Sequence, residues 1–320
     1  MTKQAVTTEK TQDETTLPAP RSNRPITLGH RLEYGLVQGL IFMLRAIGID
    51  AASWVAGQFT RNIGPLIKPI SKRAVQNLKI AYPDWDDQQI KKTIKDIWEN
   101  LGRTTAEMAH LDCFDPTRKD GRLTIETPEI FQEAFKSEKP VIYVSGHFAN
   151  WENLAIALHC YEQKAGIVYR AANNPLVDGL IIKRRARVMD HIQIPKGKRG
   201  ARALVDTLGK GMSLAMLIDQ KLNDGIEAPF FGKPAMSAPT PARLALKYDI
   251  PIIPVWIRRE NGAHFTLGAH QPIYLDQSKN ADAEILRVTT QLNEILASDI
   301  SKAPGQWLWL HRRWPKEIYR

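Results

Sequence analysis

Residues 139–153 read KPVIYVSGHFANWEN, and the fold that we predict for the chain rests on them. The run VIYV is β-branched and apolar, as in a buried strand, and the pair Ser145-Gly146 interrupts it. Apolar residues then return at helical spacing, at Leu154 and Leu158. A strand that turns directly into a helix places the side chains of the turn at the carboxyl edge of a sheet, where open α/β folds bind their ligands.

The turn carries two residues with acid–base chemistry, His147 and Glu152. A neutral imidazole can take a proton from a hydroxyl group, and a carboxylate on its other ring nitrogen would fix the tautomer. The alternative is structural: Asn150 is a good N-cap, an acid suits the first turn of a helix, and His147 would be an ordinary loop histidine. Ser145 lacks the G-x-S-x-G frame of an elbow nucleophile, so we expect the activated hydroxyl to belong to a substrate. No H-E-x-x-H motif supports a zinc site.

Composition indicates a globular protein with an anionic partner. The chain has 320 residues, of which 43% are hydrophobic and 24% are charged, as in a folded protein with a substantial core. The formal net charge of +10 favours nucleic acid, acidic lipid, a phosphorylated substrate or an acidic protein as the partner. The two cysteines, Cys113 and Cys160, belong to no motif and indicate a reducing compartment. No N-terminal stretch resembles a cleaved signal peptide.

Two segments precede the α/β pattern. Residues 1–28 are polar and free of aromatic side chains, so we expect a disordered tail. Residues 29–60 carry an apolar stripe at helical spacing and are predicted to form a membrane-associated helix. About nine strongly apolar residues each favour membrane insertion by roughly 0.3 to 0.6 kcal/mol of insertion free energy. Arg45 and Asp50 each oppose it by roughly 2.5–3.5 kcal/mol, so the terms about cancel. A transmembrane helix, a helix lying in the membrane interface and a soluble helix packed on the core therefore all stay open.

Residues 61–320 are predicted to form one α/β domain. A helical region comes first, with a helix over 72–78 that ends before Pro83 and another that starts at the aspartates of 84–87. Strand patterns then alternate with helical ones. The strands are expected at 123–125, 141–144, 166–170, 192–194, 213–219, 252–257, 264–267 and 272–275, and the helices at 128–137, 174–189, 200–208, 241–248 and 281–297. This alternation predicts a mixed, mostly parallel central sheet flanked by helices.

Two clusters of side chains are either binding surfaces or structural features. Eight basic residues and one acid lie between Lys183 and Arg202, which suits a solvated helix face or an anion platform for lipid phosphates or an acidic carrier protein. No zinc-finger, RNA-recognition or helix-turn-helix pattern supports nucleic acid as the partner. Residues 306–314, QWLWLHRRW, suit a wall beside a membrane interface and equally a terminal segment that seals the core.

Six pieces, taken in order, resemble the bacterial lipid A biosynthesis acyltransferases of the late lauroyl/myristoyl type, within the lysophospholipid acyltransferase superfamily. They are 146–152 (GHFANWE), Tyr169-Arg170 with Asn174-Pro175, Asp219-Gln220, 230–235 (FFGKPA), 241–245 (PARLA) and 306–314. The resemblance covers roughly residues 31–314. Glutamate rather than aspartate at position 152 is closer to the lipid A branch than to the glycerolipid branch. Relatives often have glycine where Ala149 stands, a departure that narrows the space beside His147.

The resemblance implies an O-acyltransferase of lipopolysaccharide biosynthesis. It would move a fatty acyl group from acyl carrier protein to a hydroxyl of a lipid A precursor of the Kdo2-lipid IVA type, with His147 as general base and Glu152 as its partner. Arg170 is the candidate for binding a phosphate or the oxyanion of the reaction. The substrate-binding residues that the resemblance implies are Arg170, Asn174, Asp219, Gln220, Phe231, Gly232 and Arg243. Neither a metal nor an organic cofactor is required.

The resemblance also implies a setting and partners. The expected location is the cytoplasmic face of the cell inner membrane, where an interfacial or single-pass N-terminal helix would hold the protein. The expected partners are an acyl-acyl carrier protein donor, a lipid A precursor and an anionic membrane surface, with no nucleic acid. The same chemistry on a lysophospholipid or another glycolipid is one alternative. A non-enzymatic membrane-binding protein that keeps a decayed site is another.

Overall fold

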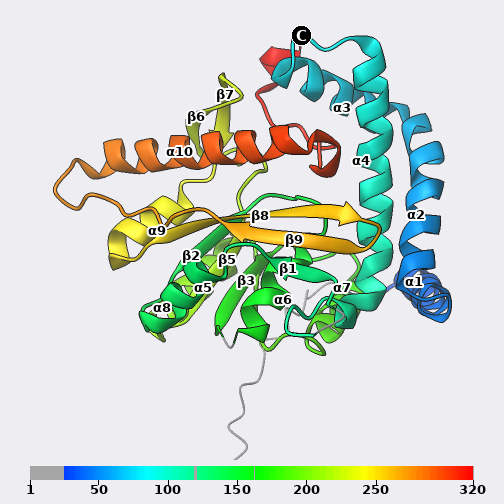
Figure 1. Cartoon of the computed structure of the whole chain (residues 1–320), viewed down its shortest axis with the longest axis horizontal. Coiled ribbons are helices and arrows are strands. Elements are labelled where there is room, and N and C mark those ends of the chain that lie inside the picture. The colour runs from blue at the N-terminus through cyan, green and yellow to red at the C-terminus, as the bar shows by residue number, and fades with distance from the viewer. Residues whose placement is uncertain (1–24, 119–120, 162, 320) are drawn as a thin grey trace, which may run out of the picture.

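The computed structural model describes residues 25–118, 121–161 and 163–319 (Figure 1). Most of the predicted tail, residues 1–24, lies outside the described residues. Two elements stand where the sequence predicts one membrane-associated helix: α1 (Leu28–Ala46) and α2 (Ile49–Ile63). The chain breaks at Gly48, whose φ of 76° lies in the left-handed region that glycine adopts without steric cost. Among the described residues, no helix has the length and the apolar character needed to cross a membrane.

The helical region ahead of the sheet is confirmed. It contains α3 (Lys68–Ala81), α4 (Asp87–Glu107) and two 3₁₀ turns, η1 (Gly64–Leu66) and η2 (Met108–Cys113). A capping box opens α4, in which Asp86 and Gln89 each bond to the backbone N–H of the other. Figure 1 shows α2 and α4 side by side at one edge of the molecule.

The central sheet has seven strands in the order β1-β9-β8-β2-β5-β3-β4. Their bounds are β1 (Leu123–Ile125), β2 (Ile142–Ser145), β3 (Ala165–Tyr169), β4 (Ile192–Pro195), β5 (Ser213–Leu217), β8 (Ile252–Asn261) and β9 (His264–Ala269). Of the strand pairs described within this sheet, β8–β9 is antiparallel and the others are parallel, so the predicted mixed, mostly parallel sheet is confirmed. All four residues of β2 are buried, as expected for a central parallel strand covered on both faces.

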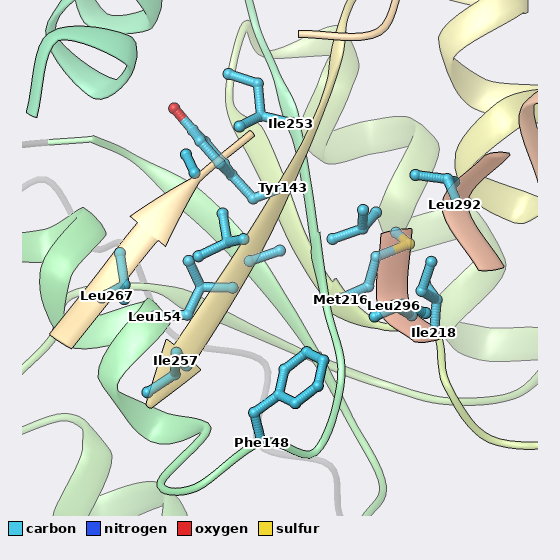
Figure 2. Packing of buried hydrophobic residues seen from close by; sticks show 14 of the residues in the cluster. Tyr143, Phe148, Leu154, Met216, Ile218, Ile253, Ile257, Leu267, Leu292 and Leu296 are labelled. Atoms are coloured by element: carbon cyan, nitrogen blue, oxygen red, sulfur yellow. The ribbon is translucent and has the colours of Figure 1, made fainter. Parts of the chain in front are cut away.

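Helices cover both faces of this sheet. Because parallel crossovers are right-handed, α5 (Pro128–Lys136), α6 (Glu152–Cys160) and α7 (Pro175–Arg185) lie on one face, and α8 (Lys198–Gly209) and α9 (Thr240–Tyr248) on the other. The long helix α10 (Ala281–Lys302) joins the second group. Figure 2 shows Met216 of β5 and Ile218, which follows β5, beside Leu292 and Leu296 of α10.

The secondary structure differs from the predictions in three places. Residues 272–275 form no strand, since only an isolated bridge joins Ile273 to Ile252. The sequence reading missed the separate hairpin of β6 (Ile226–Phe230) and β7 (Lys233–Ser237), whose turn uses the left-handed backbone of Phe231 and Gly232. The predicted helix over 174–189 is shorter, because α7 ends at Arg185.

The tryptophans of residues 306–314 seal the core. Trp307, Trp309 and Trp314 are all buried, which decides between the two readings of this segment. Asn77 of α3 fixes the segment by donating to the backbone carbonyls of Trp309 and His311, at 2.6 and 2.7 Å.

Candidate active site

The turn after β2 is held from several directions. Ala149 has a φ of 40°, and its carbonyl accepts from Thr104 Oγ1 at 2.7 Å and Asn100 Nδ2 at 3.3 Å, both on α4. Its N–H donates to the carbonyl of Gln306 at 2.8 Å. These bonds fix the backbone on both sides of Ala149, so the turn presents His147 in one orientation.

A buried charge network supports the same turn from beneath. Glu107 of α4 is fully buried and forms an ion pair with Arg259 of β8. It also accepts from Ser53 of α2 at 2.8 Å and from Asn150 of the turn at 3.0 Å. One carboxylate thus joins α2, α4, the sheet and the turn.

His147 bonds to an aspartate from the neighbouring strand. Its Nδ1 lies 2.7 Å from Asp219 Oδ1, and its backbone N–H donates to Asp219 Oδ2 at 2.8 Å. The indole N–H of Trp307 donates to the same Oδ2 at 2.7 Å. Burial by itself would raise the pKa of this carboxyl, but the charge and hydrogen bonds of His147, with the Trp307 bond, hold the pKa of Asp219 well below its usual range.

The predicted contact between His147 and Glu152 is corrected by this geometry. Glu152 is buried at the start of α6, and its two carboxylate oxygens accept from Arg185 of α7, at 2.6 and 2.8 Å. Arg185 is buried too and donates to Gln193 at 3.0 Å. A buried carboxylate needs a charged partner, and Arg185 supplies it where the sequence spacing had suggested His147.

A cavity of about 360 Å³ opens beside His147. It lies on the α6 and α7 face of the sheet, and its apolar wall comes from α6, β3 and β5. Glu152 and Arg185 form part of the wall as a neutralised pair, while Arg170, Lys196 and His311 supply positive or titratable groups. The volume falls in the usual range of small-molecule sites.

Of the other predicted substrate-binding residues, some line the cavity and the rest do not. Arg170 and Gln220 line the cavity, and Gln220 Nε2 lies 3.5 Å from His147 Nε2. Asn174 is buried, caps α7 and donates to the carbonyl of His30 in α1, so its contacts are structural. The remaining predicted residues, which lie outside the cavity lining, are Phe231 and Gly232 in the β6–β7 turn and Arg243, exposed on α9.

The basic residues between 183 and 202 do not all lie at the surface. Arg185 is buried against Glu152, and Arg184 is half-buried beside the carbonyl of Ala109. Lys196 and Arg202 are exposed on separate elements.

Sequence reasoning missed the specific partners of this site: Arg185 for Glu152, and Trp307 for Asp219. Both residues stood in motifs that the sequence had singled out, but only as a basic run and an aromatic segment. Within the described parts of the chain, no group of three His, Cys, Asp or Glu side chains could hold a metal ion.

Comparison with known proteins places the chain in a family. The model of the bacterial lipid A biosynthesis acyltransferases matches residues 27–316. A lipid A biosynthesis lauroyltransferase of Escherichia coli K12 is 24% identical over 77% of this chain and 79% of its own length. The palmitoleoyltransferase of the same organism is 23% identical over 78% of this chain and 82% of its own length. The myristoyltransferase is 22% identical over 82% of each. Because the family model spans nearly the whole chain, the protein belongs to the bacterial lipid A biosynthesis acyltransferase family, which supports acyl transfer in lipid A biosynthesis as its activity.

Proposed function

We propose that this protein moves a fatty acyl group from acyl carrier protein to a hydroxyl of a lipid A precursor of the Kdo2-lipid IVA type, with His147 as the general base. The observation that supports this most directly is the pair His147–Asp219 at 2.7 Å, placed at the wall of a largely apolar cavity. Family membership supports the acyl chemistry, and the apolar cavity suits a fatty chain.

Asp219 sets the protonation of the base. An ionised carboxylate can only accept, so the proton between Asp219 Oδ1 and His147 lies on Nδ1. The lone pair of the imidazole is then on Nε2, the nitrogen that lies beside Gln220 of the cavity lining. A hydroxyl that enters this cavity meets an imidazole already in the tautomer that accepts a proton.

The transfer proceeds through addition and elimination at the thioester carbonyl. Nε2 of His147 takes the proton of the acceptor hydroxyl while its oxygen bonds to the carbonyl carbon. The C–S bond then breaks, and the departing thiolate takes the proton back from the imidazolium. The products are the ester and the free thiol of the carrier, so the reaction needs no further reactant.

Positive charge at the cavity suits the oxyanion of the intermediate and the phosphates of the substrates. Arg170 follows β3 and Lys196 follows β4, so both stand at the carboxyl edge of the sheet next to His147. Neither forms an ion pair within the described residues, which leaves both charges available to a ligand. We assign the oxyanion or a substrate phosphate to Arg170, as the sequence suggested.

Glu152 acts through Arg185 in this scheme. Their ion pair is part of the cavity wall, and the guanidinium carbon of Arg185 lies 5.5 Å from the ring centre of Tyr169, a third residue of the lining. We propose a positioning role for Glu152: it keeps Arg185 neutralised so that the wall tolerates an apolar chain.

We also propose that α1 and α2 dock on the cytoplasmic face of the inner membrane. No residue of α1 is buried, and large apolar side chains are exposed along both helices and the following 3₁₀ turn. They include Leu32 (62% exposed), Leu36 (75%), Phe42 (76%), Trp54 (58%), Phe59 (65%) and Leu66 (69%). Large apolar side chains exposed on consecutive elements suit the interface of a bilayer.

The proposed chemistry is tested by His147→Ala. We expect the variant to lose transfer of labelled acyl groups from acyl carrier protein to a tetra-acylated lipid A precursor, because it removes the imidazole that Asp219 holds in the accepting tautomer. His264→Ala, an exposed histidine on β9, is the matched control and should keep full activity. Undiminished turnover by His147→Ala would refute the mechanism.

The acceptor is tested separately, because a lysophospholipid or another glycolipid would use the same chemistry. Mass spectrometry of lipids from a deletion strain should show lipid A lacking one acyl chain. An intact lipid A, together with loss of an acyl chain from a different lipid, would leave the chemistry in place and change the acceptor.

A further inference from the structure

A second cavity of about 350 Å³ lies on the opposite face of the sheet from the first. Successive side chains of a strand point to opposite faces. On β3, Ile167 and Tyr169 line only the first cavity, while Ile194 of β4 and Ile218 after β5 line only the second. The covering helices differ as well, since the first cavity is bounded by α6 and α7 and the second by α8 and α9.

The two cavities meet at the carboxyl edge of β3 and β5. Val168, Met216, Leu217, Lys196 and Gln220 line both. Gln220 is also the residue whose amide nitrogen lies 3.5 Å from His147 Nε2. A molecule that fills the second cavity therefore contacts a residue, Gln220, that also lies beside the proposed base.

The lining of the second cavity selects an alkyl chain with an anionic end. Its wall is mainly aliphatic, with Leu204 and Ala201 from α8 and Pro241 from α9. Lys196 lies at the rim shared with the first cavity, and Lys221, next to the shared residue Gln220, lines the second cavity alone. Alkyl chains gain about 0.8 kcal/mol for each buried methylene, and lysines at the rim favour a phosphate.

We propose that the second cavity binds an alkyl chain of the lipid acceptor while the first binds the acyl chain of the donor. This inference rests on the proposed function. The donor carries one acyl chain, and its carbonyl carbon must meet the hydroxyl that His147 deprotonates, so we assign that chain to the cavity that His147 lines. A second apolar cavity that meets the first at the reacting edge is then left for the other reactant. The phosphopantetheine arm of the donor fits less well, because its amides would lack partners against an aliphatic wall.

The test fills the second cavity without touching the base. Ala201 is exposed at its lining, so Ala201→Trp adds bulk there while leaving the core in place. Val205→Trp is the matched control, since Val205 is 37% exposed on the same helix and lies outside the lining of both cavities. We expect Ala201→Trp to raise the KM for the lipid acceptor about tenfold, because an alkyl chain in the narrowed cavity would bury one or two fewer methylenes. The KM for the acyl carrier protein donor should not change.

The reciprocal variant is Ala155→Phe, in the first cavity. We expect it to shift the preferred donor towards shorter acyl chains and to leave the KM for the acceptor unchanged. Lys221→Gln, a change of charge without bulk, should weaken acceptor binding and reduce its dependence on salt.

Three results would overturn the assignment. If Ala201→Trp raised only the KM for the donor, the second cavity would bind the donor and not the acceptor. Unchanged kinetics in both Ala201→Trp and Lys221→Gln would show that the cavity holds neither reactant. A donor chain-length shift in Ala201→Trp would reverse the two cavities. Failure of the unaltered protein to transfer acyl groups to any lipid would instead refute the proposed function.

Discussion

Replacing Arg259 by methionine should destabilise the whole molecule. The guanidinium of Arg259 donates to both oxygens of Glu107, to Asn100 Oδ1 at 3.2 Å and to the carbonyl of Gly262 at 2.9 Å. The Arg259 side chain is 8% exposed and that of Glu107 fully buried. Methionine keeps much of the volume and removes the charge, so that Ser53 and Asn150, both neutral, are the donors to Glu107 that remain among the described residues.

The magnitude follows from the cost of an uncompensated buried charge. Breaking a buried ion pair by removing one partner typically costs about 3–5 kcal/mol. We expect a loss of that size in the free energy of unfolding, a large fraction of the roughly 5–15 kcal/mol that holds a domain together. Because Glu107 also binds Asn150 of the catalytic turn, acyl transfer should fall as well.

Urea unfolding followed by circular dichroism measures this loss as a lower midpoint. The matched control is Arg258→Met, one residue earlier on β8, whose side chain is 37% exposed and pairs with Glu260 at 2.9 Å. An exposed pair is worth about 0–1 kcal/mol, so the control should lose no more than that. A double variant in which Glu107→Gln accompanies Arg259→Met should recover part of the loss. A loss in Arg259→Met no larger than in Arg258→Met would refute the reasoning.

Three further predictions concern the site and the membrane face. Asp219→Asn should reduce acyl transfer up to about ten-thousandfold by allowing the wrong tautomer of His147, as measured by kcat at saturating substrate. The pKa of Asp219 is lower in the folded than in the unfolded chain, so the stability that its ionised form contributes is complete above about pH 3.9 and is lost as the pH falls towards the folded pKa. In that pH range the free energy of unfolding of Asp219→Asn should therefore fall less steeply with decreasing pH than that of the unaltered protein. Ala149→Gly should raise the free energy of unfolding by about 0.5–1 kcal/mol, because glycine adopts the φ of 40° without strain, and an unchanged or lower urea midpoint would contradict this. Phe59→Glu should weaken sedimentation with anionic vesicles, whereas Glu260→Gln, on β8, should not; equal binding by both would argue against the α1–α2 face.

Some of the candidate site could be read from local patterns. The run 139–153 predicts a strand, a turn and a helix, and β2 and α6 confirm it. The carboxyl edge of that strand follows from its direction, so the location of His147 at the rim of the sheet required no tertiary information. Burial of Trp307 could not be predicted, because an aromatic segment reads the same whether a membrane or the core covers it.

Periodicity and residues close together in the chain are enough to predict the α/β class, the helical N-terminal region and the histidine at the sheet edge. Which carboxylate reaches that histidine depends on contacts between distant parts of the chain. Asp219 lies 72 residues beyond His147 and meets it because β5 pairs with β2. Glu152, only five residues away, turns towards Arg185 instead. Strand order and crossover direction set these contacts, and neither is encoded in the spacing of the residues involved.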